Sequence, residues 1–137
     1  MVGIKVGLKW FEVGSSEFLY SFFSTIVYHL EKGRWGKRFP VLMNQFYKGR
    51  IKSVDLKEAL IEIAIIRSDL SSYTPEYIIW DLDNLSKQPP WGNDISANIT
   101  SLANYFVTCN GEDLIGILEE AINTAITDNE VVEVCAL

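Results

Sequence analysis

The sequence predicts an α+β protein, a single domain over residues 1–137 in which helices pack on a small, mainly antiparallel sheet. Hydrophobic residues make up 48% of the chain, and Gly and Pro supply only 13 of its 137 residues, as in an ordinary globular domain. Apolar residues recur with helical periodicity in four segments, and β-forming runs occupy both ends of the chain and two places between them. The predicted order of elements is β-α-α-α-β-β-α-β.

The first strand is predicted over residues 2–13, where apolar residues alternate with Lys5 and Lys9. The first helix begins with Ser15 or Ser16 as its N-cap, because either hydroxyl can accept a hydrogen bond from the first turn. A wide, strongly aromatic stripe follows at helical spacing, so we expect this helix to be central to the core. The stripe consists of Phe18, Leu19, Phe22, Phe23, Ile26, Val27 and Leu30.

Two further helices are predicted in the first half of the chain. Pro40 begins a short helix that ends at Gly49, since Pro suits the first turn of a helix and Gly suits its end. Ser53 caps the next helix, and Pro75 closes the segment that follows it. The inner face of this third helix is lined by Leu56, Leu60, Ile63 and either Ile66 or Leu70.

Two buried strands and an unusual loop are predicted next. Residues 76–82 (EYIIWDL) and 104–109 (NYFVTC) are rich in β-forming residues, which indicates strands. Between them, residues 86–96 (SKQPPWGNDIS) form a loop that two prolines stiffen and that also carries a tryptophan, Trp91. This ring either folds back as a lid on the core or is presented to a partner.

The last helix and the last strand complete the prediction. Asn110 caps the helix, and Asp113 stands at its third position. Residues 131–137 (VVEVCAL) end the chain as a strand that is tied into the sheet. The apolar face of the helix consists of Leu114, Ile117, Leu118, Ala121 and Ala125.

The net charge of −6 is distributed unevenly along the chain. Residues 1–75 carry 11 Lys and Arg against seven Asp and Glu, whereas residues 76–137 carry one Lys and 11 Asp and Glu, a net charge of −10. The segment 32–52 holds seven basic residues and no acidic one. This polarity predicts electrostatic steering of a charged partner.

Nothing in the sequence predicts export or membrane insertion. No apolar run reaches about 18 residues, and the N-terminal residues lack the pattern of a signal peptide. We therefore expect a cytoplasmic protein whose two cysteines, Cys109 and Cys135, are reduced thiols.

The sequence offers little for catalysis or for binding a metal or cofactor. It contains no nucleophile elbow, phosphate-binding glycine loop or zinc-ligand spacing. Its one histidine, His29, is expected simply to end the first helix. Asp81 and Asp83, with Asp94, could hold a divalent ion for a hydrolase, but strand-end aspartates more often begin turns. We therefore expect a protein that is not an enzyme and that needs neither metal nor cofactor.

Trp35 is a second candidate for contact with a partner. It lies between Arg34 and Lys37 within the basic segment 32–52, so it could stack on a base and make the chain a small nucleic-acid-binding module. It could equally be a lid on the core whose flanking cations stay solvated. We favour the lid, because the acidic C-terminal half would repel nucleic acid.

Four stretches of the chain, taken together and in order, carry a family resemblance. They are FLYSFFSTIVYHLE (18–31), GRWGKRFPVLMNQFYKG (33–49), IIWDLDNLSKQPPWGNDIS (78–96) and YFVTCNGEDL (105–114). They resemble the immunity protein 70 family of bacterial polymorphic-toxin systems, and the WD and PPWG elements are the most specific parts of the likeness. The resemblance implies a small cytoplasmic protein that binds and neutralises the C-terminal domain of a cognate toxin, and it brings no catalytic residues.

The resemblance fits a protein whose function lies in its surface. Many toxin domains of such systems are nucleases with basic clefts, and an acidic partner can mimic phosphate and associate with them quickly. Trp91 is expected to pack its ring on the fold and leave Asn93 and Asp94 displayed. The residues that we expect to contact the toxin are Asp81, Asp83, Trp91, Asn93, Asp94, Glu112 and Asp113, together with Trp35.

Overall fold

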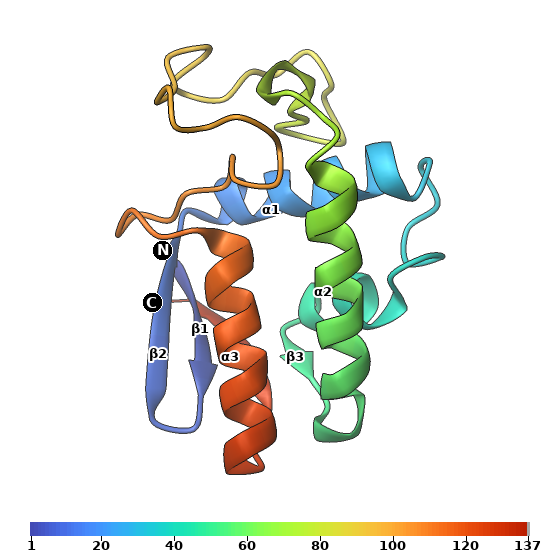
Figure 1. The fold of residues 1–137 in the computed structure, drawn as a ribbon, viewed down its shortest axis with the longest axis vertical. Coiled ribbons are helices and arrows are strands. Elements are labelled where there is room, and N and C mark those ends of the chain that lie inside the picture. The colour runs from blue at the N-terminus through green and yellow to red at the C-terminus, as the bar shows by residue number, and fades with distance from the viewer. Residues whose placement is uncertain (137) are drawn as a thin grey trace.

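Four antiparallel strands form one sheet in the order β2-β1-β4-β3 in the computed structural model, which describes residues 1–136 (Figure 1). The predicted last strand is confirmed as β4, but Leu137, at its predicted end, lies outside the described residues. The strands are β1 (Val2–Val6), β2 (Lys9–Gly14), β3 (Arg50–Ile51) and β4 (Val132–Ala136). The predicted α+β class is confirmed.

Helices cover one face of this sheet. Figure 1 shows α2 and α3 side by side in front of the strands, with α1 crossing their upper ends. The α-helices are α1 (Ser16–Thr25), α2 (Leu56–Leu70) and α3 (Leu114–Asp128). Shorter helical turns are η1 (Ile26–Leu30), which extends α1, and η2 (Leu42–Phe46), η3 (Ser53–Asp55) and η4 (Pro75–Tyr77). The strands contribute Ile4, Val6, Val13, Ile51 and Val132 to the core that they share with the helices.

The helix predictions are largely confirmed. Ser15 is the N-cap of α1, and its hydroxyl accepts a 3.1 Å hydrogen bond from the N–H of Phe18. The short helix after Pro40 is present as the π-helical turn η2. The prediction that Ser53 caps the next helix is wrong, because Ser53 lies inside the turn η3 and Asp55 is the N-cap of α2. The predicted cap of the last helix is wrong: Asp113, and not Asn110, is the N-cap of α3.

The first predicted strand is in fact a hairpin. Strands β1 and β2 pair with Val6 opposite Lys9, so the chain reverses through two residues, Gly7 and Leu8. Gly7 has a φ of +58°, which a tight hairpin turn requires and which Gly adopts without steric cost. Because apolar residues also alternate through the turn, the sequence of the whole hairpin has the pattern of one long strand.

The two strands predicted at 76–82 and 104–109 are wrong. Segment 78–83 pairs its backbone with hydroxyls of α1 instead: Thr25 Oγ1 donates to the carbonyl of Ile79 and lies 3.3 Å from its N–H, while Ser24 Oγ accepts from the N–H of Leu82. In the other segment, only an isolated bridge forms. Buried backbone groups need partners, but side chains can supply them without a second strand.

The buried carboxylate of Glu31 shapes the loop that follows η1. The residue is only 5% exposed, and its two oxygens accept hydrogen bonds of 3.0–3.1 Å from the backbone N–H groups of Gly36, Arg38 and Phe39. A carboxylate with several N–H donors is well satisfied although it is buried. Glu31 therefore fixes the loop that carries Trp35.

A second buried carboxylate, that of Glu62 on α2, holds the start of the next helical turn. Its two oxygens accept from the N–H groups of Val41 (3.1 Å) and Leu42 (2.8 Å). These N–H groups begin a helical segment and have no partner within it. Burial raises the pKa of the Glu62 carboxyl, while the two backbone hydrogen bonds oppose that rise.

Candidate functional site

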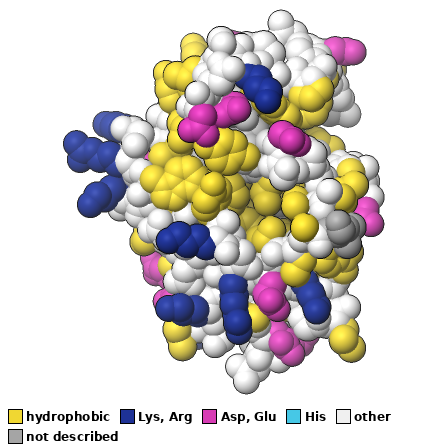
Figure 2. Space-filling model, turned by 180° about the vertical axis from the view of Figure 1, so that it is seen from behind, with side chains coloured by type: hydrophobic (Ala, Val, Ile, Leu, Met, Phe, Trp, Pro, Cys, Tyr) yellow, Lys and Arg dark blue, Asp and Glu magenta, His cyan; other side chains and the backbone are white. Residues whose placement is uncertain are grey.

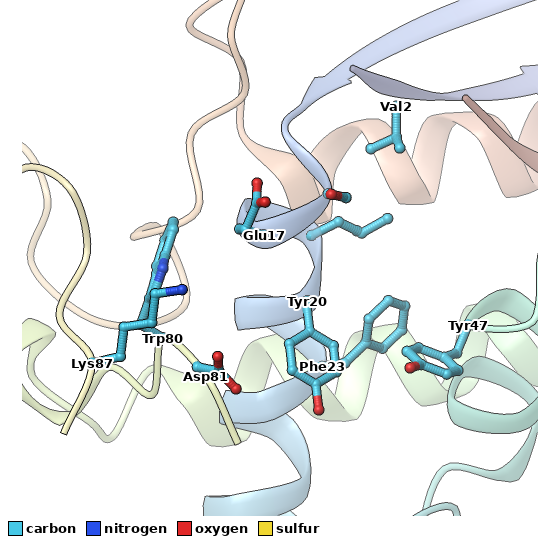
Figure 3. A pocket seen from close by; sticks show the side chains of 10 residues that line it. Val2, Glu17, Tyr20, Phe23, Tyr47, Trp80, Asp81 and Lys87 are labelled. Carbon is cyan, nitrogen blue, oxygen red and sulfur yellow. The ribbon is translucent and has the colours of Figure 1, made fainter. Parts of the chain in front are cut away.

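A pocket of about 370 Å³ lies where α1 meets the segment after Trp80 and the end of η2. Figure 2 shows hydrophobic side chains gathered around a hollow on this face of the molecule, with both acidic and basic side chains around its edges. The pocket is lined by Val2, Ser16, Glu17, Leu19, Tyr20, Phe23, Tyr47, Trp80, Asp81 and Lys87 (Figure 3). Its lining thus combines an apolar floor with charged groups at the mouth.

Tyr20, on α1, forms part of the pocket wall. Its hydroxyl donates a 2.9 Å hydrogen bond to Asp83 Oδ2. Burial, and next the bond to the Asp83 carboxylate, raise the pKa of Tyr20 to about 12. The phenol is therefore a neutral donor at physiological pH, and it holds Asp83 against the helix.

An aromatic row continues from Tyr20 along the surface. The ring centroids of Tyr20 and Tyr47 are 6.4 Å apart, and those of Tyr47 and Trp35 are 4.7 Å apart with an edge-to-face geometry. The Trp35 indole N–H donates to the carbonyl of Met43 at 2.8 Å, and its ring packs against Phe23. These contacts favour the lid interpretation of Trp35 over a base-stacking platform, because the polar edge of its ring is already used.

Two carboxylates, those of Glu17 and Asp81, line the pocket, and the carboxylate of Asp83 is held beside it by Tyr20. Asp81 Oδ1 accepts a 2.9 Å hydrogen bond from the N–H of Asp83, which turns the chain back towards Tyr20. Glu17 is exposed in the first turn of α1. Within residues 1–136, the ion pairs are those of Arg38 and Arg67, so none involves Glu17, Asp81 or Asp83. These carboxylates are therefore available to a cationic group of a partner.

The proline loop folds back onto the core through its tryptophan. The Trp91 indole N–H donates to the Tyr105 hydroxyl at 2.9 Å, and its ring meets that of Trp80 edge-to-face at 5.2 Å. The side chain nevertheless stays 38% exposed. Asn93 and Asp94 are exposed beside it, and each lines a separate, smaller hollow. The loop thus reaches the main pocket directly through Lys87, whereas Trp91 contacts it only through Trp80.

The structure does not bring Glu112 and Asp113 to the pocket. Asp113 Oδ2 accepts from the N–H of Gly116 at 3.0 Å as the N-cap of α3, and Arg67 lies 3.4 Å from the same oxygen. A structural role therefore accounts for this carboxylate. Glu112 is exposed, and the hydrogen bonds that involve it are those of its backbone with Thr108.

Two pocket residues, Tyr20 and Tyr47, carry no signal in the sequence. Tyr20 follows Phe18 and Leu19 in an apolar helix and reads as one more core residue. Tyr47 comes just before Gly49 at the end of a helix, where nothing connects it with Tyr20. Only the packing of η2 beside α1 joins the two rings. These tyrosines connect residues that were predicted separately: Tyr20 binds Asp83, which follows Asp81 closely, and Tyr47 packs on Trp35.

The structure adds two observations on chemistry. No cluster of three His, Cys, Asp or Glu side chains suited to a metal ion occurs in the described part of the chain. His29 lies with Nε2 2.7 Å from the carbonyl oxygen of Tyr77, and its ring stacks on that of Tyr73 with a centroid distance of 4.6 Å. The imidazole thus links η1 to the segment after α2. No helix within residues 1–136 is both long and apolar enough to span a bilayer.

Comparison with known protein families gives a match over most of the chain. A family model described as immunity protein 70 matches residues 4–134. No curated protein and no solved structure matches the chain. The matched range includes Tyr20, Tyr47 and every residue predicted to contact a partner, so the family match covers the candidate surface as well as the fold.

Proposed function

The chain belongs to the immunity protein 70 family, and from this premise we propose that it binds a cognate bacterial toxin domain directly and neutralises it in the cytoplasm. The family match over residues 4–134 is the observation that carries the proposal. In this proposal the protein acts as a stoichiometric inhibitor rather than as an enzyme. Such an inhibitor needs a stable scaffold and a complementary surface, and it needs no reactive group.

The surface around the pocket supports a role in protein binding. Tyr47 is 44% exposed although it packs on Trp35 and Tyr20, so a large aromatic side chain is presented in a fixed orientation. Rigid aromatic side chains beside charged groups are enriched among the residues that dominate protein–protein binding energies. Asp81 and Asp83 lie next to these rings and have no cationic partner within the described residues.

The charge of the chain favours a toxin domain with a basic surface, and a nuclease is one class that fits. Residues 76–137 carry a net charge of −10, and Asp81 and Asp83 come from this half. Complementary charge of this size accelerates encounter with a positively charged cleft. The exposed acidic groups Asp94 and Glu112 add to the long-range field without touching the pocket.

Co-expression with the toxin domain encoded immediately upstream of this gene tests the proposal. We expect cells that carry both proteins to grow, and we expect the two to co-elute at a one-to-one ratio from a sizing column. An insertion that stops translation of this chain is the control, and it should restore killing. Undiminished killing together with separate elution would show that the protein does not neutralise this toxin.

A further inference from the structure

We propose that the pocket beside Tyr20 receives the side chain of an arginine from the toxin domain. The inference rests on the proposed function, because it specifies which chemical group of the toxin this surface recognises. The floor, the walls and the mouth of the pocket each match a different part of an arginine side chain.

The floor and the walls suit the stem and the plane of arginine. Leu19 and Phe23 provide apolar surface, against which the three methylene groups of the stem can pack. The rings of Tyr20, Tyr47 and Trp80 are arranged around the same space (Figure 3). A guanidinium group is planar and stacks on aromatic faces, and the attraction is strongest where the pair is shielded from water.

The mouth of the pocket supplies the negative charge. Figure 3 shows the carboxylates of Glu17 and Asp81 between Trp80 and Tyr20. Asp81 uses only Oδ1, towards the N–H of Asp83, so its second oxygen can accept from a guanidinium. A guanidinium offers five N–H donors in a fixed fork, which allows it to reach a carboxylate with two hydrogen bonds.

An apolar anchor fits this pocket less well. Filling the mouth with a leucine or phenylalanine side chain would remove Glu17 and Asp81 from water without giving them a partner, which is costly. A lysine would satisfy the charge but would not match both the aromatic faces and the two carboxylates. Arginine is therefore the occupant that the lining favours.

Lys87 also lines the pocket and acts against an incoming cation. Its ammonium group partly offsets the two carboxylates, so the three charged groups of the lining leave a net charge of −1. Removing this charge should strengthen binding of an arginine, whereas it should not strengthen binding of a neutral side chain. Lys87 therefore gives a test in which affinity rises, and a loss of folding cannot imitate that result.

Three capped tripeptides, glycine-X-glycine with X as arginine, citrulline or leucine, test the pocket with the isolated protein. Citrulline has the shape of arginine but no charge. Binding is followed by NMR through the backbone N–H signals of Tyr20 and Tyr47 and the indole N–H of Trp80. We expect the arginine peptide to shift these signals and to bind at least about fivefold more tightly than the other two.

Variants that each neutralise one charge make the test specific. Asp81→Asn keeps the Oδ1 acceptor of the turn, and it should weaken arginine binding about fivefold or more. Lys87→Gln should strengthen it, while Glu120→Gln, an exposed site on α3 outside the pocket, should change nothing. Equal binding of the arginine and citrulline peptides, or an unaltered affinity in Asp81→Asn, would overturn the inference.

The same variants with the toxin domain separate the two proposals. Wild-type binding that Asp81→Asn leaves unchanged would refute the arginine pocket and leave the inhibitor proposal standing. Absence of wild-type binding would refute the inhibitor proposal, and the peptides would still decide the chemistry of the pocket. Loss of toxin affinity in Asp81→Asn, with Glu120→Gln unaffected, would support both.

Discussion

The Tyr20 hydroxyl donates a hydrogen bond to Asp83 across 63 residues of sequence, and this contact joins α1 to the irregular segment after Trp80. Replacing Tyr20 by Phe removes the bond and keeps the ring. Because the bond is exposed, we expect the free energy of unfolding to fall by only about 0.5–1.5 kcal/mol, as measured by urea denaturation. A loss above about 3 kcal/mol would mean that the phenol has a larger structural role than this contact gives it.

The same pair predicts a pH dependence in the alkaline range. The pKa of Tyr20 is raised to about 12 in the folded protein, whereas an ordinary tyrosine has a pKa of about 10. The contribution of the neutral phenol to stability is fully present below pH 10, and it is lost as the pH rises from about 10 to about 12. Wild-type protein should therefore lose more stability than Tyr20→Phe between these pH values. Parallel losses in the two proteins would contradict the assignment.

Thr25 is expected to hold the segment after η4 in place. Its hydroxyl pairs with both the N–H and the carbonyl of Ile79, so Thr25→Val keeps the shape but leaves two backbone groups without partners. We expect a loss of about 1–3 kcal/mol in the free energy of unfolding, and faster amide hydrogen exchange at Ile79. Ser21→Ala is the control, because the Ser21 hydroxyl bonds only to the carbonyl of Phe18 in its own helix. Equal effects of the two variants would argue against this anchoring role.

Glu62 is expected to stabilise the basic segment 32–52, because its carboxylate binds two backbone N–H groups of that segment. Glu62→Gln can offer an acceptor to only one of the N–H groups of Val41 and Leu42, and its amide NH₂ would face the other. We expect a loss of about 1–3 kcal/mol on thermal or urea unfolding. Glu58→Gln, on the exposed side of the same helix, should cost much less. Similar losses in both variants would mean that the two N–H groups do not depend on Glu62.

The helices of this fold could be predicted from the sequence, because their apolar stripes depend only on local spacing. The strands at 76–82 and 104–109 could not be distinguished from buried irregular chain. Their β-forming residues reflect burial, and the partners of the first segment are the hydroxyls of Ser24 and Thr25. Those two residues lie in an apolar helix, where nothing local indicates what they bind.

The candidate site could be predicted only in fragments. Asp81, Asp83 and Trp35 were identified separately, from charge and from an aromatic ring beside glycines. The pocket that lies among them depends on Tyr20 and Tyr47, which meet because η2 packs beside α1. Asp113 is predicted from the sequence at the start of the last helix, and its use as the N-cap is a local feature, whereas its proximity to Arg67 depends on tertiary packing.

The last prediction concerns the surface that contacts the toxin. Asp83 borders the pocket through Tyr20, and Asp94 is exposed on the proline loop, so the double variant Asp83→Lys, Asp94→Lys reverses charge on both sides of Trp91. Glu120→Lys, Asp128→Lys makes the same change in net charge at exposed positions of α3. Notably, Glu119 is unsuitable as a control, because it forms an ion pair with Arg67.

If steering by the acidic loops brings the toxin to this surface, the first pair should slow association about tenfold or more at low salt. The effect should shrink as salt is added, because exposed charges are screened. Loss of the Tyr20 bond should lower the melting temperature only slightly, so folding would not explain the change. The α3 pair should have a much smaller effect. Equal association rates for all the variants would place the contact elsewhere, and the basic segment 32–52 around Trp35 would then be the next surface to test.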